Sequence, residues 1–250
     1  MEVKTIYKYP ESLEKKITHY CPGCHHGIVH KLVAELIDEF GILEKTIIVW
    51  PIGCSVLGYE YFKTDGCVAA HGRAPAMATG IKRANPENFV LAYQGDGDLA
   101  SIGMAEIVHA ATRGEKITVV FINNTNYGMT GGQMAPTTLI GQKTTTSPYG
   151  RDPNVSGYPI KVAEFLSNLD GVAYIARAAL NKPARISQAK KFLKKAFNAQ
   201  IKGIGFSLVE FLSACPVQWH MPPLKALERI ENELIPYYPL GEFKIKEGVE

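Results

Sequence analysis

Residues 89–98 (FVLAYQGDGD) and residues 117–124 (ITVVFINN) decide the fold. Each stretch begins with an apolar run that predicts a buried strand, at residues 89–93 and 117–122, and each run ends in small or polar residues. Strands that are apolar along almost their whole length are typical of parallel sheets covered by helices on both faces. The two stretches therefore predict an α/β fold with a mostly parallel sheet and helices on both faces.

The rest of the chain alternates between strand and helix patterns, as repeated βαβ units require. Apolar residues recur at spacings of three and four in residues 26–40, and Gly41 provides a stop signal for that helix. Further helices are expected at residues 74–83, 99–113, 160–169 and 186–200. Further strands are expected at residues 46–50, 68–70, 172–176 and 206–211.

The same pattern divides the chain into three parts. Residues 1–20 form an N-terminal extension, residues 21–214 an α/β domain, and residues 215–250 a tail whose five prolines predict that it wraps the surface or a partner. Within the domain, residues 125–159 are rich in Gly, Thr, Pro, Asn and Tyr and have little periodicity. Stretches of this length without secondary structure are usually functional loops, so this loop is a candidate lid or interface.

Composition excludes several classes of protein. The 250 residues include 27 Lys and Arg against 24 Asp and Glu, a net charge of +3, which is too small to indicate a nucleic-acid partner. No apolar stretch approaches the roughly 18 residues of a membrane span. Residues 1–16 lack the apolar centre of a signal peptide. We therefore expect a cytoplasmic protein with no membrane partner.

The Gly-Asp-Gly-Asp sequence at residues 95–98 predicts a diphosphate and magnesium site. Glycines let the backbone approach a ligand, and the N-terminus of the following helix offers N–H groups to an anion. An aspartate beside a phosphate requires a cation between them, and Mg²⁺ is commonly held by carboxylates and phosphate oxygens. Asn124 follows Asp96 by 28 residues at the end of the next strand, and a crossover brings both to one sheet edge. The alternative is that Asp96 and Asp98 only cap the helix.

The five cysteines are an unlikely set for disulfides, because their number is odd and the expected compartment is reducing: Cys21, Cys24, Cys54, Cys67 and Cys215. The sequence Cys-Pro-Gly-Cys-His at residues 21–25 has three interpretations. Haem attachment requires export, and a redox dithiol normally follows a strand. The third interpretation is half of a four-cysteine site for zinc or an iron–sulfur cluster. It is favoured because Cys54 lies in a Gly-Cys-Ser loop at a strand end, although spacing does not separate the two metals.

The spacing from the GDG sequence to Asn123-Asn124 resembles the cofactor signature of thiamine-diphosphate enzymes. Five motifs in one order closely resemble the β subunit of 2-oxoacid:ferredoxin oxidoreductases over about residues 17–239. Those motifs are YCPGCH (20–25), IGCS (52–55), HGRA (71–74), QGDGD (94–98) and NYGMTGGQ (126–133). The stretches GGQMAPTT and SPYGRD place the chain nearer to the 2-oxoisovalerate and 2-oxoglutarate branch. The resemblance implies oxidative decarboxylation of a 2-oxoacid with coenzyme A to acyl-CoA, CO₂ and reduced ferredoxin.

The resemblance also implies three groups of site residues. Magnesium ligands would be Asp96, Asn124 and the backbone carbonyl of Asn126. Thiamine diphosphate would contact Ile52, Gly53, Cys54, Ser55, His71, Gly97, Asp98, Gly128, Met129, Thr130, Gly131, Gly132 and Gln133. A [4Fe–4S] cluster would be held by Cys21, Cys24, Cys54 and Cys215. Cys67 has no counterpart among these ligands and is expected to be a buried small hydrophobe.

A partner is implied because the chain offers no residue for the glutamate that activates the aminopyrimidine ring. That residue belongs to the α subunit in this family, so we expect activity only in the complex, with γ and δ subunits as further candidate partners. Arg73 and Arg151 are candidates for facing substrate or partner, with an ordinary surface position as the alternative. Two other functions stay open: a non-redox thiamine-diphosphate lyase or synthase with a structural Cys₄ zinc site, and a zinc-stabilised binding subunit without catalysis.

Overall fold

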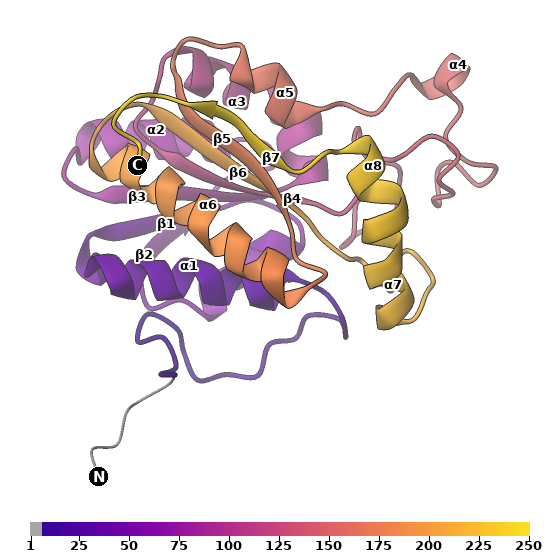
Figure 1. The fold of residues 1–250 in the computed structure, drawn as a ribbon, viewed down its shortest axis with the longest axis horizontal. Helices are drawn as coiled ribbons and strands as arrows, with labels where there is room; N and C mark the ends of the chain where they lie inside the picture. Colours follow the sequence, from indigo (N-terminus) through magenta and orange to yellow (C-terminus); the bar gives the residue numbers. More distant parts are fainter. Residues whose placement is uncertain (1–6) are drawn as a thin grey trace.

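A computed structural model describes residues 7–250, so residues 1–6 of the expected N-terminal extension lie outside the described residues. One seven-stranded sheet has the order β2-β1-β3-β4-β6-β5-β7 (Figure 1). Its strands are β1 (Thr46–Trp50), β2 (Asp65–Val68), β3 (Phe89–Gly95), β4 (Thr118–Asn123), β5 (Val172–Ala179), β6 (Phe206–Leu212) and β7 (Gly241–Ile245). All neighbouring strands are parallel except the β5–β7 pair. The expected α/β fold with a mostly parallel sheet is confirmed.

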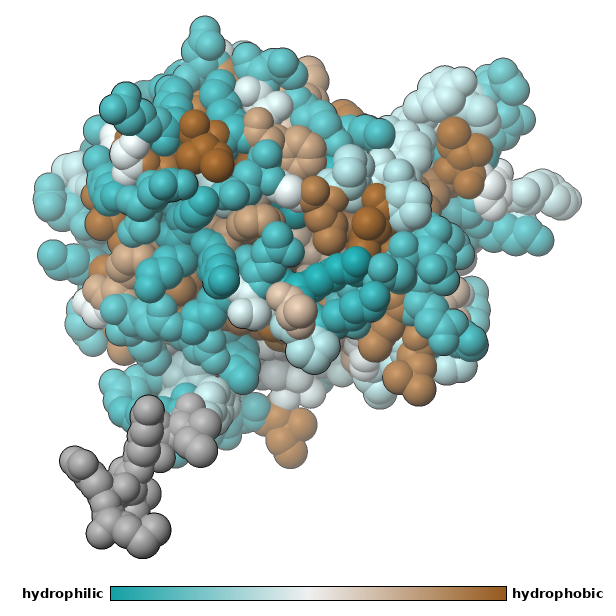
Figure 2. Space-filling view, viewed as in Figure 1, coloured by the Kyte–Doolittle hydropathy of each residue, from teal (hydrophilic) through white to brown (hydrophobic). Residues whose placement is uncertain are grey.

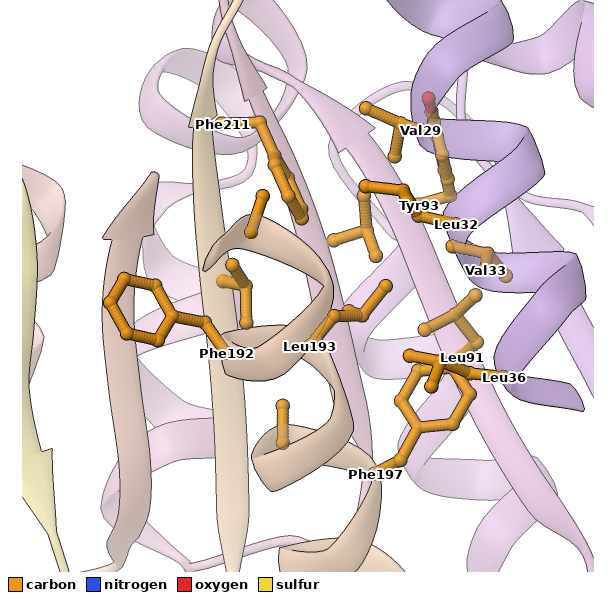
Figure 3. Close-up of a cluster of buried hydrophobic side chains, with 14 of the residues drawn as sticks. Val29, Leu32, Val33, Leu36, Leu91, Tyr93, Phe192, Leu193, Phe197 and Phe211 are labelled. Atoms are coloured by element: carbon orange, nitrogen blue, oxygen red, sulfur yellow. The ribbon is translucent and has the colours of Figure 1, made fainter. Parts of the chain in front are cut away.

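Helices cover both faces of the sheet. On one face, α1 (His26–Phe40) and α6 (Pro183–Ile201) pack against β3 and β6, and the labelled side chains in Figure 3 meet between them. On the other face lie α2 (Ala74–Ala84), α3 (Met104–Thr112) and α5 (Val162–Ser167). Within residues 7–250, no helix combines the length and apolar character needed to cross a bilayer.

Helix α1 forms where the sequence predicts it. Its buried residues Val29, Leu32, Val33 and Leu36 lie on one stripe at helical spacing. It ends at Gly41, which takes a left-handed conformation with φ of 62° and donates its N–H to the carbonyl of Asp38. The apolar stripe packs against α6 and β3, and this packing fixes the position of the N-terminus of α1. Cys21 and Cys24 lie just before that N-terminus.

The helix expected at residues 99–113 is interrupted. A π-helical turn spans Asp98–Ile102, and α3 begins only at Met104. Gly103 lies at the break. A side chain at this position would come within 2.8 Å of the Gly72 carbonyl oxygen, so the close approach requires glycine. Single π-helical turns within helices frequently mark functional sites, and this one holds Asp98 at the carboxyl edge of the sheet.

Two other elements differ from expectation. Strand β2 covers Asp65–Val68 instead of residues 68–70, because its pairing with β1 ends at Trp50. The tail after residue 214 does more than wrap the surface: it forms α7 (Pro223–Arg229) and α8 (Ile235–Tyr237), and its strand β7 joins the sheet. Buried tail residues, including Ile230 and Tyr238, pack against Leu212 of β6.

The topology places the marked motifs together. Strands β1, β3 and β4 are adjacent and parallel, so their carboxyl ends lie at one edge. The loops after these strands carry Gly53-Cys54-Ser55, Asp96-Gly97-Asp98 and Asn124. Ligands of open α/β sheets bind outside such strand ends.

Candidate cofactor and cluster site

A cavity of about 170 Å³ lies at this edge, lined by the loops after β1, β3 and β4. Except for the last three, all the residues expected to contact thiamine diphosphate line it: Ile52, Gly53, Cys54, Ser55, His71, Gly97, Asp98, Gly128, Met129 and Thr130. The expected metal ligands Asp96, Asn124 and Asn126 also line it. Gly131, Gly132 and Gln133 do not, and the Gln133 side chain bonds instead to Thr130.

Asp96 is a buried carboxylate whose hydrogen-bond partners are all neutral. It accepts hydrogen bonds from the Thr137 hydroxyl at 2.6 Å and from the Gly97 N–H at 2.9 Å. Burial raises the pKa of Asp96 to about 7. Nearby, the side-chain oxygen Oδ1 of Asn126 is buried and has no hydrogen-bond partner. A buried carboxylate without a counter-charge beside an unpaired buried oxygen fits the ligand set that Mg²⁺ prefers.

Gly97 must lack a side chain because Tyr127 packs directly on it. A Cβ at this position would lie 2.3 Å from Cε1 of Tyr127. The backbone after Asp96 can therefore follow the cavity wall closely.

The turn that presents Asn124 is held in a strained conformation. Thr125 has a φ of 60°, which non-glycine residues rarely adopt. Its N–H donates to Oδ1 of Asn123 at 3.2 Å, and its carbonyl accepts hydrogen bonds from Thr138 and Gln142. These bonds hold the residues on either side of the turn in place.

A buried network of charged side chains on β5 and β6 supports this turn. The Asn123 amide donates to Glu210 of β6 at 2.7 Å, and Glu210 accepts a second bond from Arg177 of β5 at 2.8 Å. Arg177 is fully buried and also pairs with Glu164. Sequence reasoning missed this network because its members lie on different elements and belong to no motif.

Asp98 orients His71. Its oxygen Oδ1 lies 2.7 Å from Nδ1 of His71 and accepts the Gly72 N–H at 2.8 Å. Its other oxygen accepts the Gln94 amide at 2.5 Å. With both oxygens engaged, Asp98 fixes the His71 ring at the wall of the cavity.

A second cavity, of about 140 Å³, adjoins the first. Its lining includes all four cysteines expected to bind the cluster: Cys21, Cys24, Cys54 and Cys215. Cys54, Asn124, Gly128 and His26 line both cavities. A methyl group placed on Gly128 would lie 3.5 Å from Sγ of Cys54 and 3.6 Å from Sγ of Cys215.

The thiols in this cavity are shielded from water to different extents. Burial raises the pKa of Cys24 to about 12 and that of Cys215 to about 11, whereas Cys21 lies on the exposed side. In residues 7–250, no three His, Cys, Asp or Glu side chains converge closely enough to hold a single metal ion.

The remaining singled-out residues lie elsewhere. Cys67 is partly buried on β2, with its Sγ 3.2 Å from Sδ of Met77, and does not line the cysteine cavity. Arg73 pairs with Glu106 and donates to the Ile102 carbonyl. For Arg151, the expected ordinary surface position was wrong. This side chain is only 5% exposed and donates to six carbonyls: those of Ala135, Pro136, Thr138, Ser156, Gly157 and Tyr158.

Comparison with known proteins gives the class first. Residues 51–211 match the family described as "Thiamine pyrophosphate enzyme, C-terminal TPP binding domain", where thiamine pyrophosphate is thiamine diphosphate. The chain therefore contains a TPP-binding domain.

Similar proteins narrow the class. The chain is 47% identical over 251 residues to ketoisovalerate oxidoreductase subunit VorA of Methanothermobacter thermautotrophicus, covering 96% of this chain and 53% of that protein. It is 39% identical to 2-oxoglutarate synthase subunit KorB of Archaeoglobus fulgidus, covering 86% of this chain and 76% of that protein. A solved structure of 2-oxoglutarate:ferredoxin oxidoreductase from Magnetococcus marinus, with 2-oxoglutarate, coenzyme A and succinyl-CoA bound, matches with a TM-score of 0.79 at 26% identity. That match covers 97% of this chain and 86% of the other.

The chain belongs to the TPP-binding subunits of the 2-oxoacid:ferredoxin oxidoreductase family. It spans about half the length of the ketoisovalerate oxidoreductase subunits that it matches.

Proposed function

We propose that this chain is the β subunit of a 2-oxoacid:ferredoxin oxidoreductase that binds thiamine diphosphate, Mg²⁺ and a [4Fe–4S] cluster. One observation carries the proposal: the cofactor cavity and the four-cysteine cavity share the lining residues Cys54, Asn124 and Gly128. Electrons from a substrate bound at the first cavity would therefore have only a short distance to travel to the second.

The cofactor-binding residues have distinct tasks in this proposal. Asp96, Asn124 and Asn126 would hold Mg²⁺, and the loops after β1 and β3 would surround the diphosphate with backbone groups. When bound, thiamine diphosphate supplies a nucleophilic carbon and accepts the electrons released by decarboxylation. The protein's contribution is to orient the cofactor and exclude water from it.

The four thiols line one cavity, which supports the proposal of a cluster. Four thiolates on one Zn²⁺, each bonded at about 2.3 Å, would have their sulfurs about 3.8 Å apart. A [4Fe–4S] cluster instead places each thiolate on a separate iron, so the ligands surround a larger volume. Cys21, Cys24, Cys54 and Cys215 line such a cavity, and metal analysis separates a cluster from zinc.

The cysteines also give the cluster two sides. Cys54 and Cys215 lie beside Gly128 at the cofactor cavity, whereas Cys21 lies on the exposed side. Cys54 and Cys215 would hold the side of the cluster nearer the cofactor, and Cys21 the side from which a bound cluster would supply single electrons to ferredoxin. The complete reaction oxidises the 2-oxoacid by two electrons, releases CO₂ and transfers the acyl group to coenzyme A.

A branched-chain 2-oxoacid such as 2-oxoisovalerate is the preferred substrate, with 2-oxoglutarate as the second candidate. The chain is more similar to the ketoisovalerate relative, at 47% identity, than to the 2-oxoglutarate relative, at 39%. No described lysine or arginine lines the cofactor cavity to bind a second carboxylate. We place the complex in the cytoplasm, where its α subunit, ferredoxin and reduced thiols are available.

Iron content and the visible spectrum of the anaerobically purified complex test this proposal. We expect a brown protein with about four iron atoms per β chain that loses its colour with dithionite. A colourless protein that contains zinc would refute the redox function and favour a non-redox thiamine-diphosphate enzyme. A panel of 2-oxoacids with coenzyme A and ferredoxin would then rank 2-oxoisovalerate against 2-oxoglutarate.

A further inference from the structure

Residues 139–158, including α4 (Pro153–Ser156), project from the body of the molecule on the side where β3 and β4 end (Figure 1). We call this segment the arm. We propose that the arm is a preformed docking element for the partner subunit that completes the cofactor site. This inference rests on the proposed function, because it takes the α subunit as the occupant.

The arm exposes large apolar or aromatic side chains to an unusual degree. Tyr149 is 98% exposed, Val155 84% and Tyr158 72%. Figure 2 shows apolar colouring on this projecting part of the surface as well as on the main body. Single exposed apolar residues are ordinary, but a group of them on one projection marks an interaction site. Tyrosine is also enriched where proteins associate.

The arm is held in shape although it has almost no regular secondary structure. The buried guanidinium of Arg151 donates to six carbonyls, three from the residues just before the arm and three from its C-terminal end. The backbone N–H of Gly141 donates to the Arg151 carbonyl at 2.9 Å, and that of Arg151 to the Gln142 carbonyl at 3.1 Å. A segment ordered before binding loses less conformational entropy when it binds. This order therefore favours association through the arm.

The base of the arm is part of the cofactor site. Just before the arm, Thr137 donates to Asp96 at 2.6 Å and Thr138 donates to the Thr125 carbonyl at 2.6 Å. Gln142, within the arm, donates to the same carbonyl at 3.0 Å. A protein that covers the cofactor cavity is thus positioned to reach the arm.

The cavity itself identifies the occupant. At about 170 Å³ it is smaller than the roughly 300–1,000 Å³ of typical ligand pockets, so a second surface must complete it. Its lining carboxylates, Asp96 and Asp98, are both engaged within the chain. A second copy of this chain would offer the same half-site again, whereas the α subunit would bring the missing carboxylate.

Association with the α subunit tests the proposal. The double variant Tyr149→Ser/Val155→Ser removes apolar surface from the arm, and Leu224→Ser/Ile201→Ser is the matched control on α7 and α6. We expect the arm variant to bind the purified α subunit at least about tenfold more weakly. The control should bind like the unmodified chain. Equal binding by the arm variant, or equal weakening in the control, would overturn the proposal.

Two further measurements separate the possible failures. Arg151→Met removes the guanidinium that donates to the six carbonyls but leaves the exposed side chains of the arm unchanged. It should therefore also weaken association with the α subunit and make the arm sensitive to proteases. If the unmodified chain self-associates through the arm and the double variant keeps its affinity for α, the occupant is a second copy and the proposal is wrong. Iron content is measured in parallel: a chain without iron refutes the proposed function, whereas normal iron with unchanged α affinity refutes only the docking role.

Discussion

Asn126 lines the cofactor cavity and also approaches a cysteine of the second cavity. Its buried oxygen Oδ1 has no protein partner, and its nitrogen Nδ2 lies 3.9 Å from Sγ of Cys215. Its backbone carbonyl is the third magnesium ligand of the proposal. Hydrogen bonds to cluster sulfurs are one way in which proteins set a reduction potential. At the scale of single residues, one side chain thus links the proposed metal site to the cysteine cavity.

Replacing Asp96 tests the metal site. Asp96→Asn keeps the shape of the side chain but removes the charge that would attract Mg²⁺. Because outer-shell changes already weaken metal affinity by about 10–100-fold, loss of this ligand should weaken magnesium-dependent binding of thiamine diphosphate at least about 100-fold. Calorimetry on the anaerobic complex would measure the change. The surface substitution Asp170→Asn should have no effect, and iron content should be unchanged in both. Undiminished magnesium dependence in Asp96→Asn would refute the assignment.

A pair of cysteine substitutions tests the proposal that four of the five cysteines bind the cluster and that Cys67 does not. Cys215→Ser should lower iron well below about four atoms per chain, because a serine oxygen is a poor ligand for iron in a cluster. Cys67→Ser makes the same chemical change at a partly buried site on β2 and should leave iron content intact. Iron analysis and the dithionite-sensitive absorbance would report both results. Equal iron loss in the two variants would contradict the ligand set.

At the scale of elements, two strands far from the motifs support the site. Arg177 on β5 and Glu210 on β6 form a buried ion pair, and Glu210 holds Asn123 at the end of β4. Because β6 pairs with both β4 and β5, the sheet itself brings the three side chains together. The order of the strands, rather than any local motif, thus determines where the Asn124 turn lies.

Removing Arg177 should destabilise the whole domain. Arg177→Met leaves Glu210 and Glu164 buried or half-buried without their counter-charge, and breaking such a pair typically costs about 3–5 kcal/mol. Anaerobic denaturant unfolding would measure the free energy of unfolding. Lys225→Met breaks the exposed pair with Glu228 and should change that free energy by no more than about 0.5 kcal/mol. A loss below 1 kcal/mol for Arg177→Met would show that the pair does not support the turn.

The sequence predicts those elements whose cause is local. The helix at His26–Phe40 has the predicted bounds because its apolar period and Gly41 are both readable in the chain. Strand β7 was missed because it follows a proline-rich segment and pairs antiparallel at the sheet edge. Gly103 is in close contact with Gly72, which is distant in the sequence. Arg151 donates to backbone carbonyls, which every residue has. Neither kind of partner leaves a pattern in the sequence.

At the scale of the molecule, the proposed function makes this chain one half of a site. Its cofactor cavity is small, its two lining carboxylates are engaged, and the arm projects beside it. Sequence motifs predict most of the residues that line the cavity because they lie at strand ends, and parallel topology brings strand ends together. The residues that the partner subunit would contribute cannot be predicted from the sequence of this chain.

Reconstitution should therefore restore what neither subunit has alone. The isolated chain should bind thiamine diphosphate weakly and reduce methyl viologen with 2-oxoisovalerate and coenzyme A at no more than the background rate. Adding the α subunit should tighten cofactor binding and start turnover, because it covers the cavity and supplies the carboxylate that activates the cofactor. Rates of CO₂ release and viologen reduction, measured against α concentration, would check this. A mixture of α with the Asp96→Asn chain is the matched control and should stay inactive. If the isolated chain turned over as fast as the complex, the cavity would already be a complete active site, and the half-site interpretation would be wrong.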